Sequence, residues 1–493
     1  MVTIKNNEDS NDFFMSKFDN YFADVGLLVK CLRKGEGREW TKGNFLFSRT
    51  DVGVCSVYRF FGVPFFTLQY NPNFKKKLYW FGRPLLTWSR APLKLNHGHP
   101  YKIETDRKKR IFIHIGGLPY FDNGSGIPRV AKKLSEEGLR HPNAEVLPVY
   151  PDPRDGTYRI ALNWICRMGY QDPYLNGIPI KSYLSDPAMT IREGDWFIHT
   201  MINPNELDFE DAHLQAMRQA GVKIGFILYD IIAERFPKYF RKRDAKNFSR
   251  WLRKIGNFDG LFAISRATLN NYALWCKEQG LPLSNSSLQW FHLGADFKKE
   301  RHQLTKSDEE QLTAIKGKDY YIQVSTIEPR KGYKQLLEAF DYLWNKGSEL
   351  CLVIVGRKGW LVDDLCRQIK KHPQLNKKLF WLSGVSDELL ISLYENSKAV
   401  VVASENEGFG LSVAEGAFYK KPLLLRDIPV FREIVEEKAF YFKGLDGMSL
   451  AYKIQEMDNT LNKNDGTSEV MSTTPNVPSW SKSFEEFYQL LKC

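Results

Sequence analysis

The sequence predicts an α/β protein with two Rossmann-like, doubly wound domains and an additional basic, aromatic-rich N-terminal region. Two observations support this fold class. From residue 109 onward, short apolar strand patterns alternate with helix patterns, and this alternation is interrupted once by a polar segment before it resumes. Strands that alternate with helices form a parallel sheet with both faces covered. A chain of 493 residues is long enough for two such domains.

The first Rossmann-like domain is predicted over residues 109–300. It opens with an apolar strand at 110–117 that runs into glycines, followed by a glycine-rich loop and a helix over 127–139. A helix is also predicted at 266–278. The remaining strands are expected at 145–149, 196–199, 223–228, 260–264 and 287–293.

Residues 301–318 are predicted to be a linker with at most one helical turn, because they are polar and show no strand pattern. The second domain is predicted over 319–456. Its strands are expected at 321–326, 350–356, 378–384, 399–402 and 421–426, and its helices at 333–344, 362–371, 387–396 and 409–419. Residues 457–493 are predicted to form a polar loop and a closing amphipathic helix at 481–491.

Residues 1–108 show no βα rhythm, and one amphipathic helix is predicted there over 14–28. Residues 51–110 hold 12 Lys and Arg against 3 Asp and Glu, together with 12 aromatic residues. Such a region suits an anionic membrane surface, where each basic residue contributes about 1 kcal/mol. A solvated face of a small domain or a nucleic-acid surface are the alternatives.

The composition is that of a folded protein, with 43% hydrophobic and 26% charged residues. No apolar run is long enough for a membrane span, and the N-terminus does not resemble a secretory signal. The 7 scattered cysteines indicate reduced thiols and a cytoplasmic location. No convincing metal cluster is visible, since His97 and His99 suit a loop better than a ligand set.

The first candidate site residue is Glu415, within the stretch "ASENEGFGLSVAEGA" at 403–417. If 409–419 is helical, Glu415 lies only about 40° from the centre of an apolar stripe. A buried carboxylate needs a partner, which is either a group within the fold or a ligand hydroxyl. Because Glu415 lies near the start of a helix that follows a strand, where ligands bind in such sheets, the ligand is the favoured partner.

Three further features agree with a ligand site in the second domain. Glu407 lies in the loop before that helix, and Gly408 and Gly410 beside it permit close approach of a ligand. Arg330 and Lys331 follow the strand at 321–326, where two cations suit a diphosphate.

These features belong to blocks of sequence that resemble glycosyltransferase family 4, retaining enzymes with the glycosyltransferase-B fold. The resemblance covers about 109–492 and is closest to bacterial mannosyl- and rhamnosyltransferases of O-antigen and capsule assembly. The matching blocks lie at 123–130, 228–240, 259–268, 291–297, 325–332, 353–360, 404–415 and 426–434.

The resemblance implies a donor site in the second domain. Glu415 would bind the ribose and Glu407 the transferred sugar, while Arg330 and Lys331 would neutralise the leaving diphosphate. The other donor-binding residues implied there are Gly408, Phe409, Gly410, Ser325, Gly356 and Val385, the last of them beside the base.

In the first domain, the resemblance implies that the loop of Gly124, Ser125 and Gly126 closes over the donor, with Arg129 and Tyr229 on the acceptor side. Tyr229 stands where many family members carry a histidine. Asp230 is therefore expected to be the catalytic group from this domain, although the departing phosphate can itself take the acceptor proton.

The predicted function is a retaining, metal-independent hexosyltransferase without a cofactor. It would move mannose from GDP-mannose onto a lipid-linked or polysaccharide acceptor, at the inner face of the cytoplasmic membrane and beside partner enzymes of polysaccharide assembly. The alternatives are a rhamnosyl- or glucosyltransferase using a dTDP- or UDP-sugar, and a non-catalytic nucleotide-sugar-binding module. Nucleic acid is not expected as a partner, because it leaves Glu407 and Glu415 unexplained.

Overall fold

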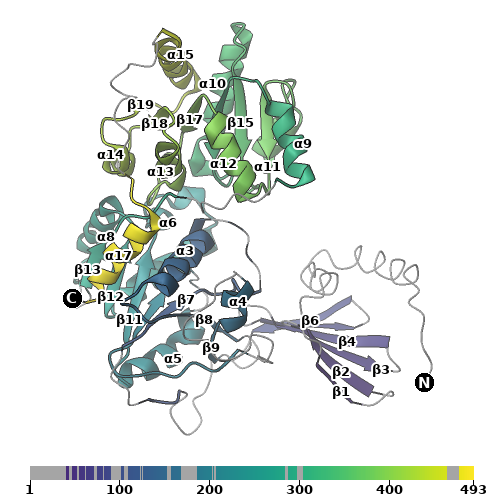
Figure 1. The fold of residues 1–493 in the computed structure, drawn as a ribbon, viewed down its shortest axis with the longest axis vertical. Helices are drawn as coiled ribbons and strands as arrows, with labels where there is room; N and C mark the ends of the chain where they lie inside the picture. Colours follow the sequence, from purple (N-terminus) through teal and green to yellow (C-terminus); the bar gives the residue numbers. More distant parts are fainter. Residues whose placement is uncertain are drawn as a thin grey trace. The chain divides into compact units, whose positions relative to one another are not determined.

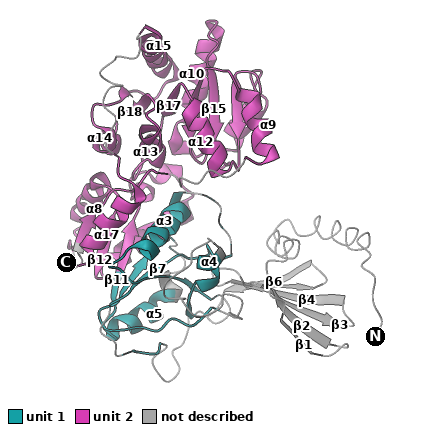
Figure 2. Cartoon of the chain, viewed as in Figure 1, with its two compact units in different colours: residues 1–224 teal, residues 225–493 magenta. Residues whose placement is uncertain are grey.

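The computed structural model describes most of the chain from residue 101 onward and the backbone of six strands before it. The described ranges are 101–104, 109–120, 122, 124, 126–152, 157–167, 186–202, 204, 207–283, 287–296, 304–463 and 477–492. The predicted helix at 14–28, and also Ser125, His97 and His99, lie outside the described residues. The chain divides into two compact units, residues 1–224 and residues 225–493 (Figure 2).

The N-terminal strands form a six-stranded antiparallel sheet in which each strand pairs with the next along the chain (Figure 1). They are β1 (Trp40–Gly43), β2 (Phe47–Val52), β3 (Cys55–Phe60), β4 (Val63–Tyr70), β5 (Lys75–Trp80) and β6 (Arg83–Ser89). No sheet was predicted in this region from the sequence. Its strands therefore add an all-antiparallel element to the predicted α/β fold.

The rest of the first unit is an α/β layer. Its elements are β7 (Ile111–His114), α3 (Gly126–Arg140), β8 (Val146–Pro151), β9 (Tyr158–Ile160), α4 (Leu162–Arg167), β10 (Trp196–His199) and α5 (Leu207–Gln219). Strands β8 and β10 pair with β7 in parallel, and β9 pairs with β8 antiparallel. Every residue of β7 and β10 is buried, as expected for parallel strands with helices on both faces.

Seven strands form the sheet of the first Rossmann-like domain, in the order β13-β12-β11-β10-β7-β8-β9. The elements that continue it are β11 (Lys223–Leu228), α6 (Ile232–Arg235), η3 (Pro237–Tyr239), α7 (Lys242–Ile255), β12 (Gly260–Ala263), α8 (Arg266–Glu278) and β13 (Ser287–Trp290). The sequence predicted β10, β11 and α8 at these bounds.

The predicted linker differs from the structure, because it contains a helix of ten residues, α9 (Lys306–Ile315). Thr305 begins this helix with a capping box: its hydroxyl accepts from the Asp308 amide, and the Asp308 carboxylate accepts from the Thr305 amide. These two bonds satisfy backbone donors that a helix start otherwise leaves unpaired.

The second sheet has six parallel strands in the order β16-β15-β14-β17-β18-β19. Its strands are β14 (Tyr320–Val324), β15 (Cys351–Val355), β16 (Leu379–Leu382), β17 (Ala399–Val402), β18 (Leu423–Arg426) and β19 (Phe440–Phe442). Its helices are η4 (Pro329–Lys331), α10 (Tyr333–Asn345), α11 (Asp363–Lys370), α12 (Asp387–Asn396), α13 (Leu411–Phe418), α14 (Pro429–Val435) and α15 (Gly447–Lys463). The strand order reverses between β14 and β17, which is where doubly wound sheets bind ligands.

Alternate residues of the central strand β17 belong to different cores. Ala399 and Val401 pack into a core with α10, α11 and α15, whereas Val400 and Val402 pack into one with α12, α13 and α14. This period of two places an apolar layer on each face of the sheet. Helix α15 continues to Lys463, beyond the predicted domain boundary at 456.

The helix α17 (Trp480–Leu490) confirms the predicted closing helix and packs on the first Rossmann-like sheet. The Phe487 ring lies 5.3 Å from the Phe262 ring of β12 and 5.1 Å from the Phe291 ring after β13. Among the described residues, no helix has both the length and the apolar character needed to cross a bilayer.

Candidate active site

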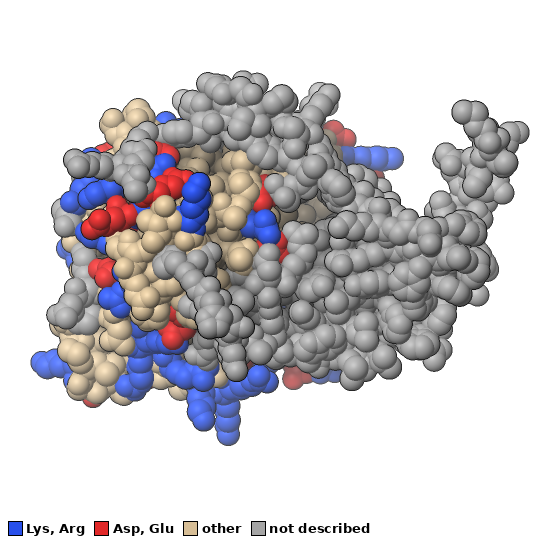
Figure 3. Space-filling view, turned by 90° about the horizontal axis from the view of Figure 1, so that it is seen from below, with Lys and Arg blue, Asp and Glu red and all other residues tan. Residues whose placement is uncertain are grey.

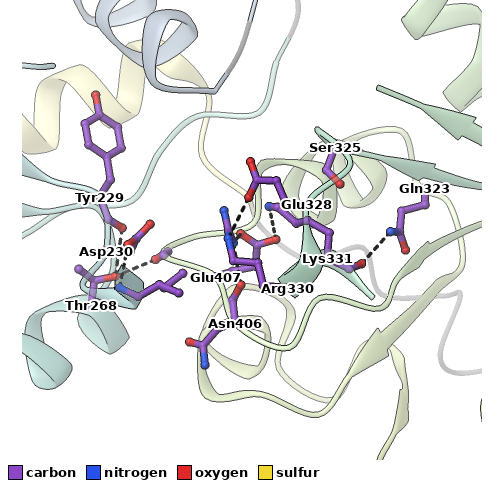
Figure 4. A network of polar contacts seen from close by, with 12 residues as sticks. Tyr229, Asp230, Thr268, Gln323, Ser325, Glu328, Arg330, Lys331, Asn406 and Glu407 are labelled. Carbon is purple, nitrogen blue, oxygen red and sulfur yellow. Dashed lines mark hydrogen bonds and ion pairs between the residues drawn. The ribbon is translucent and has the colours of Figure 1, made fainter. Parts of the chain in front are cut away.

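The two loops at the reversal point of the second sheet bring three predicted residues together. Arg330 and Lys331 lie in η4 after β14, and Glu407 lies in the loop after β17. The Glu407 carboxylate accepts hydrogen bonds from Lys331 Nζ at 2.5 Å and Arg330 Nη1 at 3.1 Å (Figure 4). The three side chains are only 10–13% exposed. The two cations that are expected to bind the diphosphate thus form ion pairs with the carboxylate that is expected to bind the sugar.

Electrostatics keep Glu407 ionised. Burial disfavours its charged form, but Lys331 and then Arg330 outweigh that effect and lower the pKa of the carboxyl to about 2. Arg330 also forms an ion pair with Glu328, at 3.0 Å between Nε and Oε2, and so lies between two carboxylates (Figure 4). Burial raises the pKa of Glu328. Sequence reasoning missed Glu328, although it lies in the matching block at 325–332, two positions before Arg330.

Asp230 and Tyr229, which follow β11, differ in environment. Asp230 is half-buried, its Oδ1 accepts from the Ile232 amide at 2.9 Å, and burial raises the pKa of its carboxyl against the opposing effect of Arg330. Tyr229 is buried, burial raises its pKa, and its ring points away from Glu407 and Arg330 in Figure 4. Of the two, Asp230 is the one whose side chain lies with the charged cluster.

Gly408 has a structural reason to be glycine. A Cβ atom there would lie 1.8 Å from the Tyr229 carbonyl oxygen. The Gly408 carbonyl in turn accepts hydrogen bonds from Ser265 Oγ at 2.6 Å and Thr268 Oγ1 at 3.0 Å. The loop after β17 therefore packs tightly against the ends of β11 and β12, a contact that the sequence did not reveal.

Gly410 and Phe409 complete this loop. Gly410 has φ of +100° and immediately precedes α13, so a residue with a side chain would be strained there. Phe409 is buried, with its ring 5.8 Å from the His292 ring. The loop conformation thus depends on one glycine with positive φ and one anchored aromatic ring.

Glu415 lies on α13 and is 4% exposed, in agreement with its predicted place on an apolar face. Its Oε2 accepts a hydrogen bond from the Tyr394 hydroxyl of α12 at 2.8 Å. The carboxylate therefore has a partner within the fold. A carboxylate can accept several hydrogen bonds at once, so a bond to Tyr394 does not by itself exclude a ligand hydroxyl as another donor.

The other predicted donor-binding residues of this sheet lie just after its strands. Ser325 follows β14, and its Oγ lies 2.9 Å from the Tyr333 hydroxyl. Gly356 follows β15, where a Cβ atom would lie 1.8 Å from the Ser325 carbonyl oxygen. Val385 is half-buried after β16 and follows Gly384, which has φ of +74°. All three therefore lie at the carboxyl edge of the sheet.

Gly124, Gly126 and Arg129 lie in the other compact unit. Gly124 has φ of +63°, and its amide donates to Asp122 Oδ1 at 2.8 Å. Gly126 begins α3, and Arg129 lies half-buried in its first turn. The predicted strand, glycine-rich loop and helix are confirmed in order.

Glu433 of α14 is a second residue that sequence reasoning missed. Its carboxylate accepts from the Arg266 and Ala267 amides at 2.7 and 2.8 Å, and lies 2.7 Å from His292 Nε2. Burial opposes its ionisation, but the His292 contact and the two amides lower its pKa. Glu433 thus caps α8 from a distant part of the chain, which no local motif indicates.

Comparison with known proteins identifies relatives of this chain. Residues 305–463 match the model of the family "Glycosyl transferases group 1". The serotype-specific mannosyltransferase WbdA of Escherichia coli is 35% identical over 356 residues, which are 71% of this chain and 42% of WbdA. The O-antigen chain mannosyltransferase RfbU of Salmonella typhimurium is 26% identical over 140 residues, 28% of this chain and 38% of RfbU. The chain spans about two-fifths of the length of these relatives.

A solved structure shows the same fold. Alr3699/HepE of Anabaena, in complex with UDP and glucose, aligns with a TM-score of 0.51 at 14% identity, over 78% of this chain and 100% of that one. The two mainly parallel α/β sheets are those of the predicted glycosyltransferase-B fold.

Proposed function

We propose that this chain, a group 1 glycosyl transferase over residues 305–463, is a retaining hexosyltransferase that moves mannose from GDP-mannose. The acceptor is a lipid-linked saccharide or polysaccharide of O-antigen or capsule assembly. The observation that carries the proposal is the cluster of Arg330, Lys331 and Glu407 at the reversal point of the second sheet. The names of the relatives, which are mannosyltransferases, supply the choice of sugar.

Arg330 and Lys331 stabilise the leaving diphosphate. Negative charge grows on the diphosphate as the glycosidic bond breaks, and cations fixed in advance stabilise that charge without reorganising. Glu407 and Glu328 already hold Arg330 from two sides, so its guanidinium is oriented before the donor binds. Catalysis at this cluster then needs no metal ion.

Glu407 and Asp230 bind the hexose. Once the diphosphate shares the two cations, Glu407 Oε1 and Oε2 accept from sugar hydroxyls, and Asp230 contacts the sugar from the end of β11. The departing phosphate takes the acceptor proton, so a separate base is not required. Glu415 accepts from the ribose hydroxyls alongside its bond to Tyr394.

The enzyme acts at an anionic membrane surface through its basic residues at 51–110. Outside that region, Lys and Arg side chains of the described residues gather along the lower rim of the face drawn in Figure 3. Binding to vesicles with and without anionic lipid tests this part of the proposal. Equal binding to both kinds of vesicle would contradict it.

Donor hydrolysis without acceptor tests the reaction. GDP-mannose, UDP-hexoses and dTDP-rhamnose are each supplied in EDTA, and the anomer of the released sugar is followed by NMR. We expect turnover of GDP-mannose with the anomeric configuration retained at early times. Turnover of a UDP- or dTDP-sugar instead would replace the donor, and binding without turnover of any donor would favour a non-catalytic module.

A further inference from the structure

Two neighbouring strands of the first unit end in buried histidines. His114 ends β7 and His199 ends β10, and the parallel register places these two residues opposite each other. Helix α5 adds Glu210, so three elements contribute one side chain each. All three residues are buried, with exposures of 0%, 2% and 1%.

The three side chains converge on one point. Glu210 Oε2 lies 2.9 Å from His199 Nε2, and Glu210 Oε1 lies 3.7 Å from His114 Nε2. The centroids of the two imidazole rings are 4.3 Å apart. One nitrogen or oxygen atom from each residue lies within 4.8 Å of the other two, which is close enough for all three to bind a single ion.

Of the three residues, His114 is the one in which both ring nitrogens lack a hydrogen-bond partner among the described residues, although the side chain is completely buried. Buried polar atoms in native proteins are almost always paired, so each exception calls for an explanation. A ligand between His114 and Glu210 would supply the missing partner.

A proton shared by His199 and Glu210 is the competing explanation. It would satisfy the 2.9 Å pair but would leave His114 as it is. A proton shared by that pair therefore explains one contact, whereas an ion bound by all three residues would also give a partner to a ring nitrogen of His114.

We propose that His114, His199 and Glu210 bind a divalent transition-metal ion of the zinc type. Two imidazoles and a carboxylate are ligands that Zn²⁺ prefers, and a water completes four-coordination. The Tyr158 hydroxyl donates to Glu210 Oε1 at 2.8 Å, which orients the carboxylate as outer-sphere partners of metal sites do. The ion connects the ends of β7 and β10 to α5, and none of its ligands belongs to the donor-binding cluster.

This site could not be recognised in the sequence, because its three ligands do not form a short motif. His114 and His199 are 85 positions apart, and Glu210 follows 11 positions later. Only the parallel pairing of β7 with β10 brings the two histidines together. The expectation of no convincing metal cluster was therefore based on spacing alone.

Metal content of the tag-free chain of 493 residues tests the proposal. We expect about one zinc per chain after purification, and a melting temperature that rises by several degrees when Zn²⁺ is added to chelator-treated protein. Both effects should be lost in His199→Gln and Glu210→Gln. They should persist in His372→Gln, a control histidine that pairs with Asp341 in the other unit. Metal-free wild type with no shift, or unchanged zinc in the two site variants, would overturn the site.

X-ray absorption on the wild-type zinc protein keeps the test decisive if the site variants do not fold. The expected shell has two imidazole nitrogens and a carboxylate oxygen at roughly 2.0–2.2 Å. A shell containing sulfur, or only one imidazole, would assign the zinc to other residues and refute this assignment.

Discussion

At the scale of single residues, the charged cluster explains how two cations are held in a buried place before a donor binds. Arg330 contacts Glu328 and Glu407, and Lys331 contacts Glu407. Buried charges are tolerated when they are paired in this way. The same pairing makes the cluster sensitive to acid.

The first prediction concerns the stability of the cluster. In the folded protein Glu407 has a pKa of about 2, below its ordinary value of 4.5, so it stabilises the fold above pH 4.5 and ceases to do so as the pH falls to about 2. Glu407→Gln should lower the free energy of unfolding by roughly 3 kcal/mol at pH 7. Urea unfolding at pH 7 and pH 3 measures this effect. The difference in free energy of unfolding between the wild type and Glu407→Gln should be smaller at pH 3. Glu338→Gln, on the surface of α10, is the control. An effect of Glu407→Gln on the free energy of unfolding that is the same at both pH values would contradict the prediction.

A second prediction concerns transfer activity. Lys331→Met should lower kcat by about 10²-fold or more with a smaller change in KM, because the lost charge acts on the leaving diphosphate. The exposed Lys334→Met, on the adjoining α10, removes the same charge outside the cluster and should leave kcat unchanged. Steady-state kinetics with the accepted donor measure both. An equal loss of kcat in the two variants would mean that the net charge of this region, and not the position of Lys331, determines the rate.

The third prediction follows from the close contact at Gly408. Gly408→Ala should destabilise the protein by about 3 kcal/mol or more, since its Cβ would lie 1.8 Å from the Tyr229 carbonyl oxygen. Gly280→Ala is a matched control in open space at φ of +61°, with an expected cost of about 1 kcal/mol. Thermal unfolding compares the stability of the two variants. A similar loss of stability in both would show that the loop can shift to accommodate the Cβ atom at 408.

The sequence predicted Glu407, Arg330 and Lys331 as one site because each lies in the segment between a strand and the next α-helix, and parallel strands end at a common edge. It could not predict that Glu415 bonds to Tyr394, since that contact depends on how α12 and α13 pack. The same holds for Glu433, whose three partners come from α8 and the segment after β13. Local pattern places a residue on an element, whereas its partners depend on packing between elements.

At the scale of elements, the βα units were predictable because their apolar strands are short, uniform and separated by helices. Helix α9 was not, since its sequence is polar and its apolar stripe is weak. Its start was nevertheless visible as Thr305 and Asp308, the spacing of a capping box. The antiparallel sheet before residue 90 was missed because no alternation with helices marks it.

The fourth prediction tests that cap. Thr305→Ala should destabilise the protein by about 1 kcal/mol, because it removes the hydroxyl that accepts from the Asp308 amide and donates to the Asp308 carboxylate. Thr313→Ala, on the same helix, removes a hydroxyl that bonds only the Glu309 carbonyl within the helix and should cost less. Hydrogen exchange in the first turn of α9 should rise in the first variant alone. Equal exchange in both would show that the cap is not what fixes the helix start.

At the scale of the molecule, the predicted domain boundary at 300 differs from the division into compact units after 224. The reason is physical, because β11–β13 contact the second sheet through Ser265, Thr268 and Gly408 and through Glu433. Helix α17 adds a further connection by returning to β12 and β13. A boundary predicted from a local change in composition does not take account of such contacts between segments that are distant in the sequence.

The fifth prediction concerns that return. Phe487→Ala should lower stability by about 3–5 kcal/mol, since its buried ring packs on Phe262 and Phe291. Gln489→Ala, on the exposed side of α17, should be nearly neutral. Denaturant unfolding compares the two variants. A small effect of Phe487→Ala would mean that α17 contributes little to the first Rossmann-like sheet.

The return of α17 also sets an order of events on the ribosome. Trp290 ends β13 and Trp480 begins α17, so the first residue of the helix is translated 190 positions after the last residue of the strand that it covers. At about 5–20 residues per second, Phe262 and Phe291 wait about 10–40 s for Phe487. Throughout that interval the nascent chain presents an aromatic surface that its own later residues will bury. Newly made molecules are therefore the ones most exposed to aggregation and most dependent on chaperones.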